Sequence, residues 1–297
     1  MKLKPRPTPP PPTNPDAAAP GALPSGFSKT TLAELGLNLP VGVHGAGGKL
    51  LKTFELRPWT MKEEVEVGKL KRPGMTTGRL VLELIGLFAV HVGGVKVGEM
   101  KKAERDLFLS TLYVPDALYI YTYLRREAKG SILPVKFTCP RCSEPIDLDG
   151  DLDGMDVVVV AERSAIQGKL ELQSGIQYQG KRRTKVLTEL ARWSSMLDTK
   201  ELGEGAMTRA MIEGSVVGFE DVPPEKQSPI PPAAFDDMAK ADIDDLIDYI
   251  SARTPGAQLI AETTCTKKVC AAEIIAPLNW QYDGFFETSS RRAPTRK

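Results

Sequence analysis

The chain has 297 residues, of which 41% are hydrophobic and 26% are charged, and its formal net charge is +1. This composition is typical of a soluble globular protein, and the small net charge argues against an overall field for nucleic acid or membrane binding. The most apolar stretch, LVLELIGLFAVHV at residues 80–92, is too short to cross a bilayer and contains Glu83, so we expect no membrane span.

The N-terminal segment is rich in proline, as in PRPTPPPPTNP, and residues 41–49 (VGVHGAGGK) are rich in glycine. Proline removes backbone donors, and little apolar surface is present to offset the entropy of ordering. We therefore predict a disordered arm and linker over residues 1–49. Because proline-rich sequence stands where a secretory signal would need apolar residues, we expect an intracellular protein whose cysteines are thiols or metal ligands.

A strand followed by helices is predicted over residues 50–130. The strand covers residues 50–59, and the capping box formed by Thr60 and Glu63 predicts a helix from Met61 to about Leu70. An apolar helix capped by Thr76 or Thr77 is expected to end near Gly93, and two further helices are expected over residues 101–112 and 116–126.

A strand-rich, zinc-ribbon-like region is predicted over residues 131–288, with an α/β insertion at 149–258 and a basic tail at 289–297. The expected fold class is α+β. Within the insertion and after it, we expect strands at 157–160, 169–172 and 259–263, and helices at 187–197, 207–217 and 241–251.

The four cysteines fall into two pairs, each between strand-like segments. Cys139 and Cys142 form a C-x-x-C, and Cys265 and Cys270 form a looser C-x-x-x-x-C. Two hairpins with a cysteine pair at each tip are the halves of a zinc ribbon, and four thiolates suit tetrahedral zinc. We predict one structural zinc held by these four residues, although 122 residues separate the two pairs.

Two other interpretations of this region are less favourable. A redox C-x-x-C lacks a thioredoxin-like βαβ context. A calcium loop could begin at Asp149, followed by Asp151 and Asp153, but its twelfth position is Val160 instead of a bidentate glutamate. We expect a solvated turn at these aspartates.

A catalytic constellation is not visible in the sequence. The two histidines are His44, in the predicted linker, and His91, at the end of the predicted apolar helix. Four thiolates would close the zinc shell, whereas catalytic zinc keeps an open position. We predict a protein that is not an enzyme and has no small-molecule substrate.

The order of elements resembles the T4-type baseplate proteins of contractile phage tails, a family that includes a small baseplate hub assembly protein. The resemblance covers roughly residues 50–288, from FELRPWTMKEEVEV through YIYTYLRREAKGSILPVKFTCPRC and LELQSGIQYQGKRRTKVLTEL to AMIEGSVVGFE, AKADIDDLIDYI and NWQYDGFF. It implies a structural or assembly role in a phage or contractile injection-system baseplate, through contacts with other baseplate or tail proteins. It also implies a location in the host cytoplasm during assembly, and in the virion tail or injection particle if the protein is retained.

A partner-binding segment is predicted near the C-terminus, where Trp280, Tyr282, Phe285 and Phe286 lie close together beside the basic tail. Aromatic side chains dominate cores and interfaces alike, so packing against the ribbon is the competing interpretation. The alternative function is a zinc-ribbon nucleic-acid-binding or regulatory protein. Lys267 and Lys268 favour it, but the acidic residues after the first pair oppose nucleic-acid binding.

Overall fold

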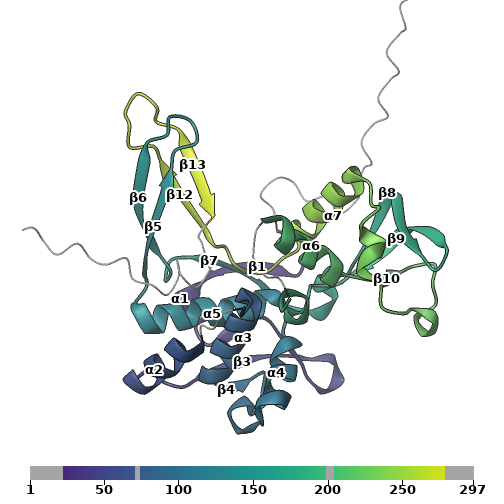
Figure 1. Cartoon of the computed structure of the whole chain (residues 1–297), viewed down its shortest axis with the longest axis horizontal. Helices are drawn as coiled ribbons and strands as arrows, with labels where there is room; N and C mark the ends of the chain where they lie inside the picture. The colour runs from purple at the N-terminus through teal and green to yellow at the C-terminus, as the bar shows by residue number, and fades with distance from the viewer. Residues whose placement is uncertain (1–22, 71–73, 199–203, 278–297) are drawn as a thin grey trace, which may run out of the picture.

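The computed structural model describes residues 23–70, 74–198 and 204–277 and shows an α+β fold (Figure 1). Short antiparallel sheets lie around a group of helices, and a two-hairpin arm projects from one side (Figure 1). The predicted fold class is confirmed.

The N-terminal part of the described chain contains strands where a linker was expected. β2 pairs with β3, and β3 with β4. The predicted linker is therefore wrong from residue 27 onward, while residues 1–22 lie outside the described residues. Proline and glycine are accommodated because the register of β2 shifts between Asn38 and Val43, which frees backbone groups for tertiary bonds. The elements are β1 (Phe27–Thr31), α1 (Leu32–Leu35), β2 (Asn38–His44), η1 (Ala46–Gly48), β3 (Leu50–Leu56) and β4 (Ala89–Val92).

The predicted helices of this region are present, with one boundary corrected. Thr76 caps the apolar helix by accepting a hydrogen bond from the N–H of Arg79 at 3.2 Å. That helix ends at Phe88, not near Gly93, because the alternating sequence AVHV of β4 extends the sheet of β3. The helices are α2 (Met61–Leu70), α3 (Thr77–Phe88), α4 (Lys102–Ser110) and α5 (Val114–Lys129), with the 3-10 turn η2 (Val97–Glu99) between β4 and α4.

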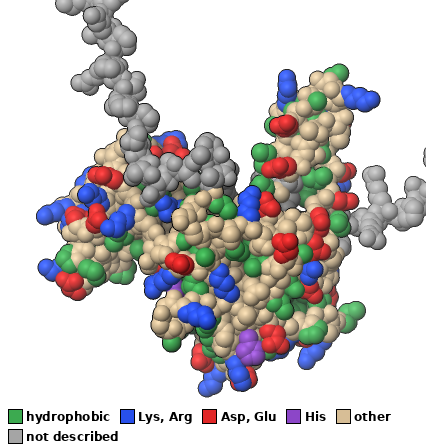
Figure 2. All heavy atoms as spheres, turned by 180° about the vertical axis from the view of Figure 1, so that it is seen from behind, with side chains coloured by type: hydrophobic (Ala, Val, Ile, Leu, Met, Phe, Trp, Pro, Cys, Tyr) green, Lys and Arg blue, Asp and Glu red, His purple; other side chains and the backbone are tan. Residues whose placement is uncertain are grey.

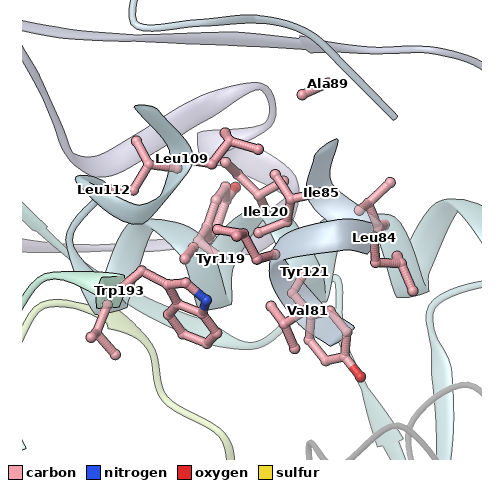
Figure 3. Close-up of a cluster of buried hydrophobic side chains, with 14 of the residues drawn as sticks. Val81, Leu84, Ile85, Ala89, Leu109, Leu112, Tyr119, Ile120, Tyr121 and Trp193 are labelled. Atoms are coloured by element: carbon pink, nitrogen blue, oxygen red, sulfur yellow. The ribbon is translucent and has the colours of Figure 1, made fainter. Parts of the chain in front are cut away.

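The largest hydrophobic core is built around α3 and α5 and extends beyond the predicted boundary at residue 130. Trp193 is fully buried against these helices, and its indole Nε1–H donates to the carbonyl of Gly78 at 3.0 Å (Figure 3). Val81 and Ile85 of α3 and Ile120 of α5 belong to the same cluster. Residues 50–130 therefore share their core with part of the predicted insertion.

The insertion contributes strands to two sheets. One places β7 between β1 and β11, and the other has the order β10-β9-β8 and packs with α6 and α7 around a second core. The elements are β7 (Asp156–Val160), η3 (Arg163–Ile166), β8 (Gly168–Tyr178), β9 (Lys181–Thr188), η4 (Trp193–Met196), α6 (Glu204–Ser215), β10 (Val216–Phe219), η5 (Pro224–Lys226), η6 (Pro232–Phe235), α7 (Lys240–Ala252) and β11 (Gly256–Ala257).

The helix predicted at residues 187–197 is wrong. β9 continues to Thr188, and the rest of the predicted range contains only the 3-10 turn η4. Tertiary hydrogen bonds replace helical ones here, since the N–H of Trp193 donates to the carbonyl of Leu112 at 2.7 Å. The helix predicted at 207–217 instead ends at Ser215, where β10 begins.

The projecting arm consists of two hairpins formed by residues 132–151 and 260–277 (Figure 1). We call their connecting turns, residues 139–144 and 265–272, the tip, and their strands the shaft. The shaft strands are β5 (Ile132–Thr138), β6 (Pro145–Asp151), β12 (Ile260–Thr264) and β13 (Glu273–Pro277).

Candidate metal centre

The tip of the arm brings all four cysteines together. Their sulfur atoms lie within 4.8 Å of one another. Two of the contacts cross between the hairpins: Cys139 Sγ lies 3.9 Å from Cys270 Sγ, and Cys142 Sγ lies 3.5 Å from Cys265 Sγ. The cysteines are free thiols. The cluster is the four-residue set predicted from the spacing, and it could hold a metal ion.

Both turns have a similar backbone conformation, which directs their cysteines toward each other. In the first turn, the N–H of Ser143 donates to the carbonyl of Cys139 at 2.9 Å, and in the second the N–H of Ala271 donates to the carbonyl of Lys267 at 3.1 Å. Ser143 and Ala271, each directly after the second cysteine of its pair, have left-handed φ values of 59° and 40°. Tight turns of this kind bring two sulfurs of one hairpin close to a shared point.

A small hydrophobic cluster supports the thiols from below. Cys139 and Cys265 are buried with Ile146 and Ile274, and Phe137 packs against them. These side chains come from the inward faces of β5, β6 and β13. The alternation of the strands thus places apolar residues beneath the sulfurs and polar residues outside.

The thiols of Cys139 and Cys265 differ in how readily they ionise. Burial disfavours the thiolate of Cys139, but the N–H groups of Arg141 and Cys142 outweigh it and lower the pKa of Cys139 to about 7. The N–H of Lys267 favours the thiolate of Cys265, but burial and the neighbouring sulfurs outweigh that donor and raise the pKa of Cys265 to about 12. Four thiolates therefore need a cation among them.

Two of the sulfur–sulfur distances can be compared with those of a tetrahedral zinc site. A Zn–S bond of about 2.3 Å places tetrahedral sulfurs roughly 3.8 Å apart. The two cross-hairpin distances, 3.5 and 3.9 Å, lie on either side of this value. A disulfide needs sulfurs at about 2.05 Å, so neither of these two pairs is a disulfide.

The other predicted residues do not join this site. Trp280, Tyr282, Phe285 and Phe286 lie outside the described residues. The aspartates of the rejected calcium loop diverge: Asp149 is exposed on β6, and Asp153 pairs with Arg126. Within the described residues, the cysteines form the one group of three or more candidate ligands close enough to share an ion.

The histidines have structural contacts that the sequence did not reveal. His44 Nε2 lies 2.6 Å from the Tyr113 hydroxyl, which donates to Glu189 and accepts from Arg192 Nη2 at 2.9 Å. Burial, assisted by nearby arginines, lowers the pKa of His44. This network joins β2 to the start of α5 and to the segment after β9. No local signal marks it, because its members are more than 60 positions apart from His44.

His91 lies on β4, not at the end of a helix. It stands opposite Glu55 of β3, and its Nδ1 lies 3.0 Å from a carboxylate oxygen of that residue. This is a cross-strand pair on a partly exposed sheet face.

Comparison with known proteins gives no relative for this chain: no family model matches it, and neither does any curated protein or solved structure. Among the described residues, none of the helices combines the length and apolar character required to cross a membrane.

Proposed function

We propose that the four cysteines hold one structural zinc and that the chain acts without catalysis, as a structural or assembly protein of a contractile phage tail or injection-system baseplate. The observation that carries the proposal is a four-thiol cluster at the end of a projecting arm (Figure 1). Such a donor set leaves no coordination position for water or substrate, so the ion's effect is on the shape of the arm.

The donor set selects the class of metal. Thiolates favour zinc, copper(I) and iron, and a tetrahedral four-sulfur arrangement is typical of zinc or iron–sulfur sites. Zinc is preferred here because two knuckle-like turns supply the ligands. The resemblance to baseplate proteins supports the assembly role, and the partners would be other baseplate or tail proteins encountered in the host cytoplasm.

Metal analysis tests the zinc site. We expect about one zinc and no iron per purified chain. Replacing Cys139 and Cys142 together by serine should abolish metal retention, whereas the control Thr266→Ala, an exposed tip residue without a thiol, should keep it. Zinc that persists in the double variant would rule out the four-ligand site.

Gene deletion in the producing organism tests the assembly role. We expect electron microscopy to show no complete contractile particles, with rescue by the wild-type gene and not by the double cysteine variant. Normal particles in the deletion strain would overturn the role.

Nucleic-acid binding is the second candidate, because three cations, Arg141, Lys267 and Lys268, lie in the tip. Asp147 and Asp149 on the outer face of the same arm oppose it, since a phosphate backbone running along the arm would meet carboxylates. Titration of a labelled duplex at increasing salt separates the two candidates. Tight, salt-sensitive binding that is lost in Lys267→Glu/Lys268→Glu would favour the nucleic-acid function.

A further inference from the structure

Exposed apolar side chains gather on the arm. Within the described residues, Ile132, Ile260, Val269 and Ile275 are large apolar residues that are exposed there. Val269, between the tip cysteines, is 89% exposed, and Ile275 on the outer face of β13 is 70% exposed. A side chain so exposed on a turn fixed by metal ligands is available for contact with a partner.

Charge is divided along the arm. Strand alternation places Asp147, Asp149 and Asp151 together on the outer face of β6, and Glu262 and Glu273 are exposed on the other hairpin. Lys136 offsets one of these charges through an ion pair of 3.6 Å with Asp147. The shaft is therefore acidic.

The tip has the opposite sign. Arg141, Lys267 and Lys268 are exposed, and none has an ion pair within the described part of the chain. Glu144, half-buried, is the carboxylate of the tip residues. Figure 2 shows basic side chains at the end of the arm and acidic side chains below them.

We propose that the arms of two copies of this chain pair side by side in antiparallel orientation, with the tip of each against the acidic shaft of the other. An arm that is basic at one end and acidic along its length is complementary to itself only in this orientation. The contact is isologous, so it closes as a dimer and does not propagate. Val269 of one copy would be covered by the shaft of the other, whose exposed isoleucines flank the carboxylates.

The position of the first hairpin and the composition of the tip both favour a second copy of this chain as the partner. In Figure 1 the β5–β6 hairpin lies on the side of the arm away from α6 and α7, so these two helices do not cover its outer face. A nucleic acid is a poorer match, since the tip residues include no aromatic side chain on which a base could stack.

The size of the arm sets the strength of the contact. Strands of seven residues extend roughly 23 Å, so paired arms bury less than the roughly 1,000 Å² of a stable interface. Self-association should be weak and sensitive to salt, and it would matter where copies are concentrated. This inference rests on the proposed assembly role for its biological setting, but its test uses the purified chain alone.

Sedimentation velocity over a concentration series tests the pairing. We expect zinc-loaded wild-type chain to form dimers at high concentration in low salt and to dissociate as salt is raised. Lys267→Glu/Lys268→Glu reverses the charge of the tip, and Asp149→Lys/Asp151→Lys reverses the charge of the shaft. Each variant alone should associate at least about tenfold more weakly, since like charges then face each other.

The decisive measurement is an equimolar mixture of the two variants. At one end of the mixed pair the acidic tip of the first variant meets the basic shaft of the second, and at the other end the unchanged basic tip of the second meets the unchanged acidic shaft of the first. Opposite charges therefore face each other at both ends, so the mixture should regain association that neither variant shows alone. Lys62→Glu/Lys181→Glu, which makes the same charge change away from the arm, should behave as wild type. Zinc content and melting confirm that each variant is folded.

A monomeric wild-type chain at all concentrations, or a mixture no stronger than its components, would overturn the pairing. Dimers that persist in both reversal variants would overturn it as well. Each of these three results leaves the assembly role testable, because gene deletion and particle microscopy do not depend on self-association.

Discussion

Asp116 of α5 is a buried carboxylate whose ionisation should reduce the stability of the fold as pH rises. It is completely buried and accepts hydrogen bonds from the N–H groups of Val41 and Gly42 at 2.8 and 2.9 Å. Burial raises its pKa from 3.8 to about 6, although these two bonds and the charges of Lys52 and Arg192 favour the carboxylate.

The direction in which stability changes with pH follows from the raised pKa of Asp116. The folded state binds the proton more tightly than the unfolded state, so the contribution to stability is present below pH 3.8 and is lost as pH rises through about 6. A shift of roughly 2 pH units corresponds to about 3 kcal/mol. Asp116→Asn removes this titration, so the unfolding free energy of wild type minus that of the variant should fall by about that amount between pH 4 and pH 7.

Urea unfolding, followed by tryptophan fluorescence at several pH values, gives this difference. Trp193 is fully buried and should report loss of the main core. If the proposed metal is released in acid, the loss affects wild type and variant alike and cancels when they are compared. A difference that is flat with pH, or that rises, would show that the two backbone donors and the nearby cations outweigh burial.

Two further predictions concern packing and the metal. Gly78→Ala should destabilise the protein by about 2–4 kcal/mol, because the new Cβ would lie 2.0 Å from the carbonyl oxygen of Met196. Gly68→Ala, in an open part of α2, should instead raise the melting temperature by improving helix propensity, and equal shifts in the two variants would contradict the packing argument. Chelation should speed amide hydrogen exchange in the arm while leaving the α3–α5 core protected, because two-stranded hairpins are only marginally stable alone. Equally faster exchange in the arm and in the core would mean that the metal stabilises the whole fold.

The parts of this fold that were predictable are those with a local signal. The spacing of Thr60 and Glu63 predicts a helix start, and α2 begins at Met61 as expected. The Thr60 hydroxyl accepts from the N–H of Lys62 at 3.3 Å and donates to the Glu63 carboxylate. The cysteine cluster was predictable despite the distance between its halves, because each half carries its own strand, turn and ligand pair. Thiol chemistry then supplies the reason for the halves to meet.

The parts that were missed depend on distant partners. β2 resembles a linker in sequence because its glycine-rich stretch lacks alternation, and its irregular backbone is held by a carboxylate more than 70 positions away. A second buried carboxylate, Asp242 of α7, performs the same task for β8, accepting from the N–H groups of Gln173 at 2.7 Å and Gly175 at 2.8 Å. Neither aspartate is distinguishable in sequence from an ordinary residue of a helical first turn.

Both hairpins of the arm are attached to the same sheet, so a small rotation at this attachment would move the tip of the arm by a larger distance. Its first hairpin leads into β7 and its second follows β11, and these two strands pair with each other, so both hairpins are attached to one sheet. The N–H of Gln258 adds a bond to the carbonyl of Asp156 at 2.8 Å. A rotation of the arm by roughly 10° about the β7–β11 pair would move its tip, roughly 23 Å away, by about 4 Å. β1 is the other neighbour of β7. A force on the chain before β1 that rotates this sheet would therefore displace the cysteine-bearing turns farther than it displaces β1.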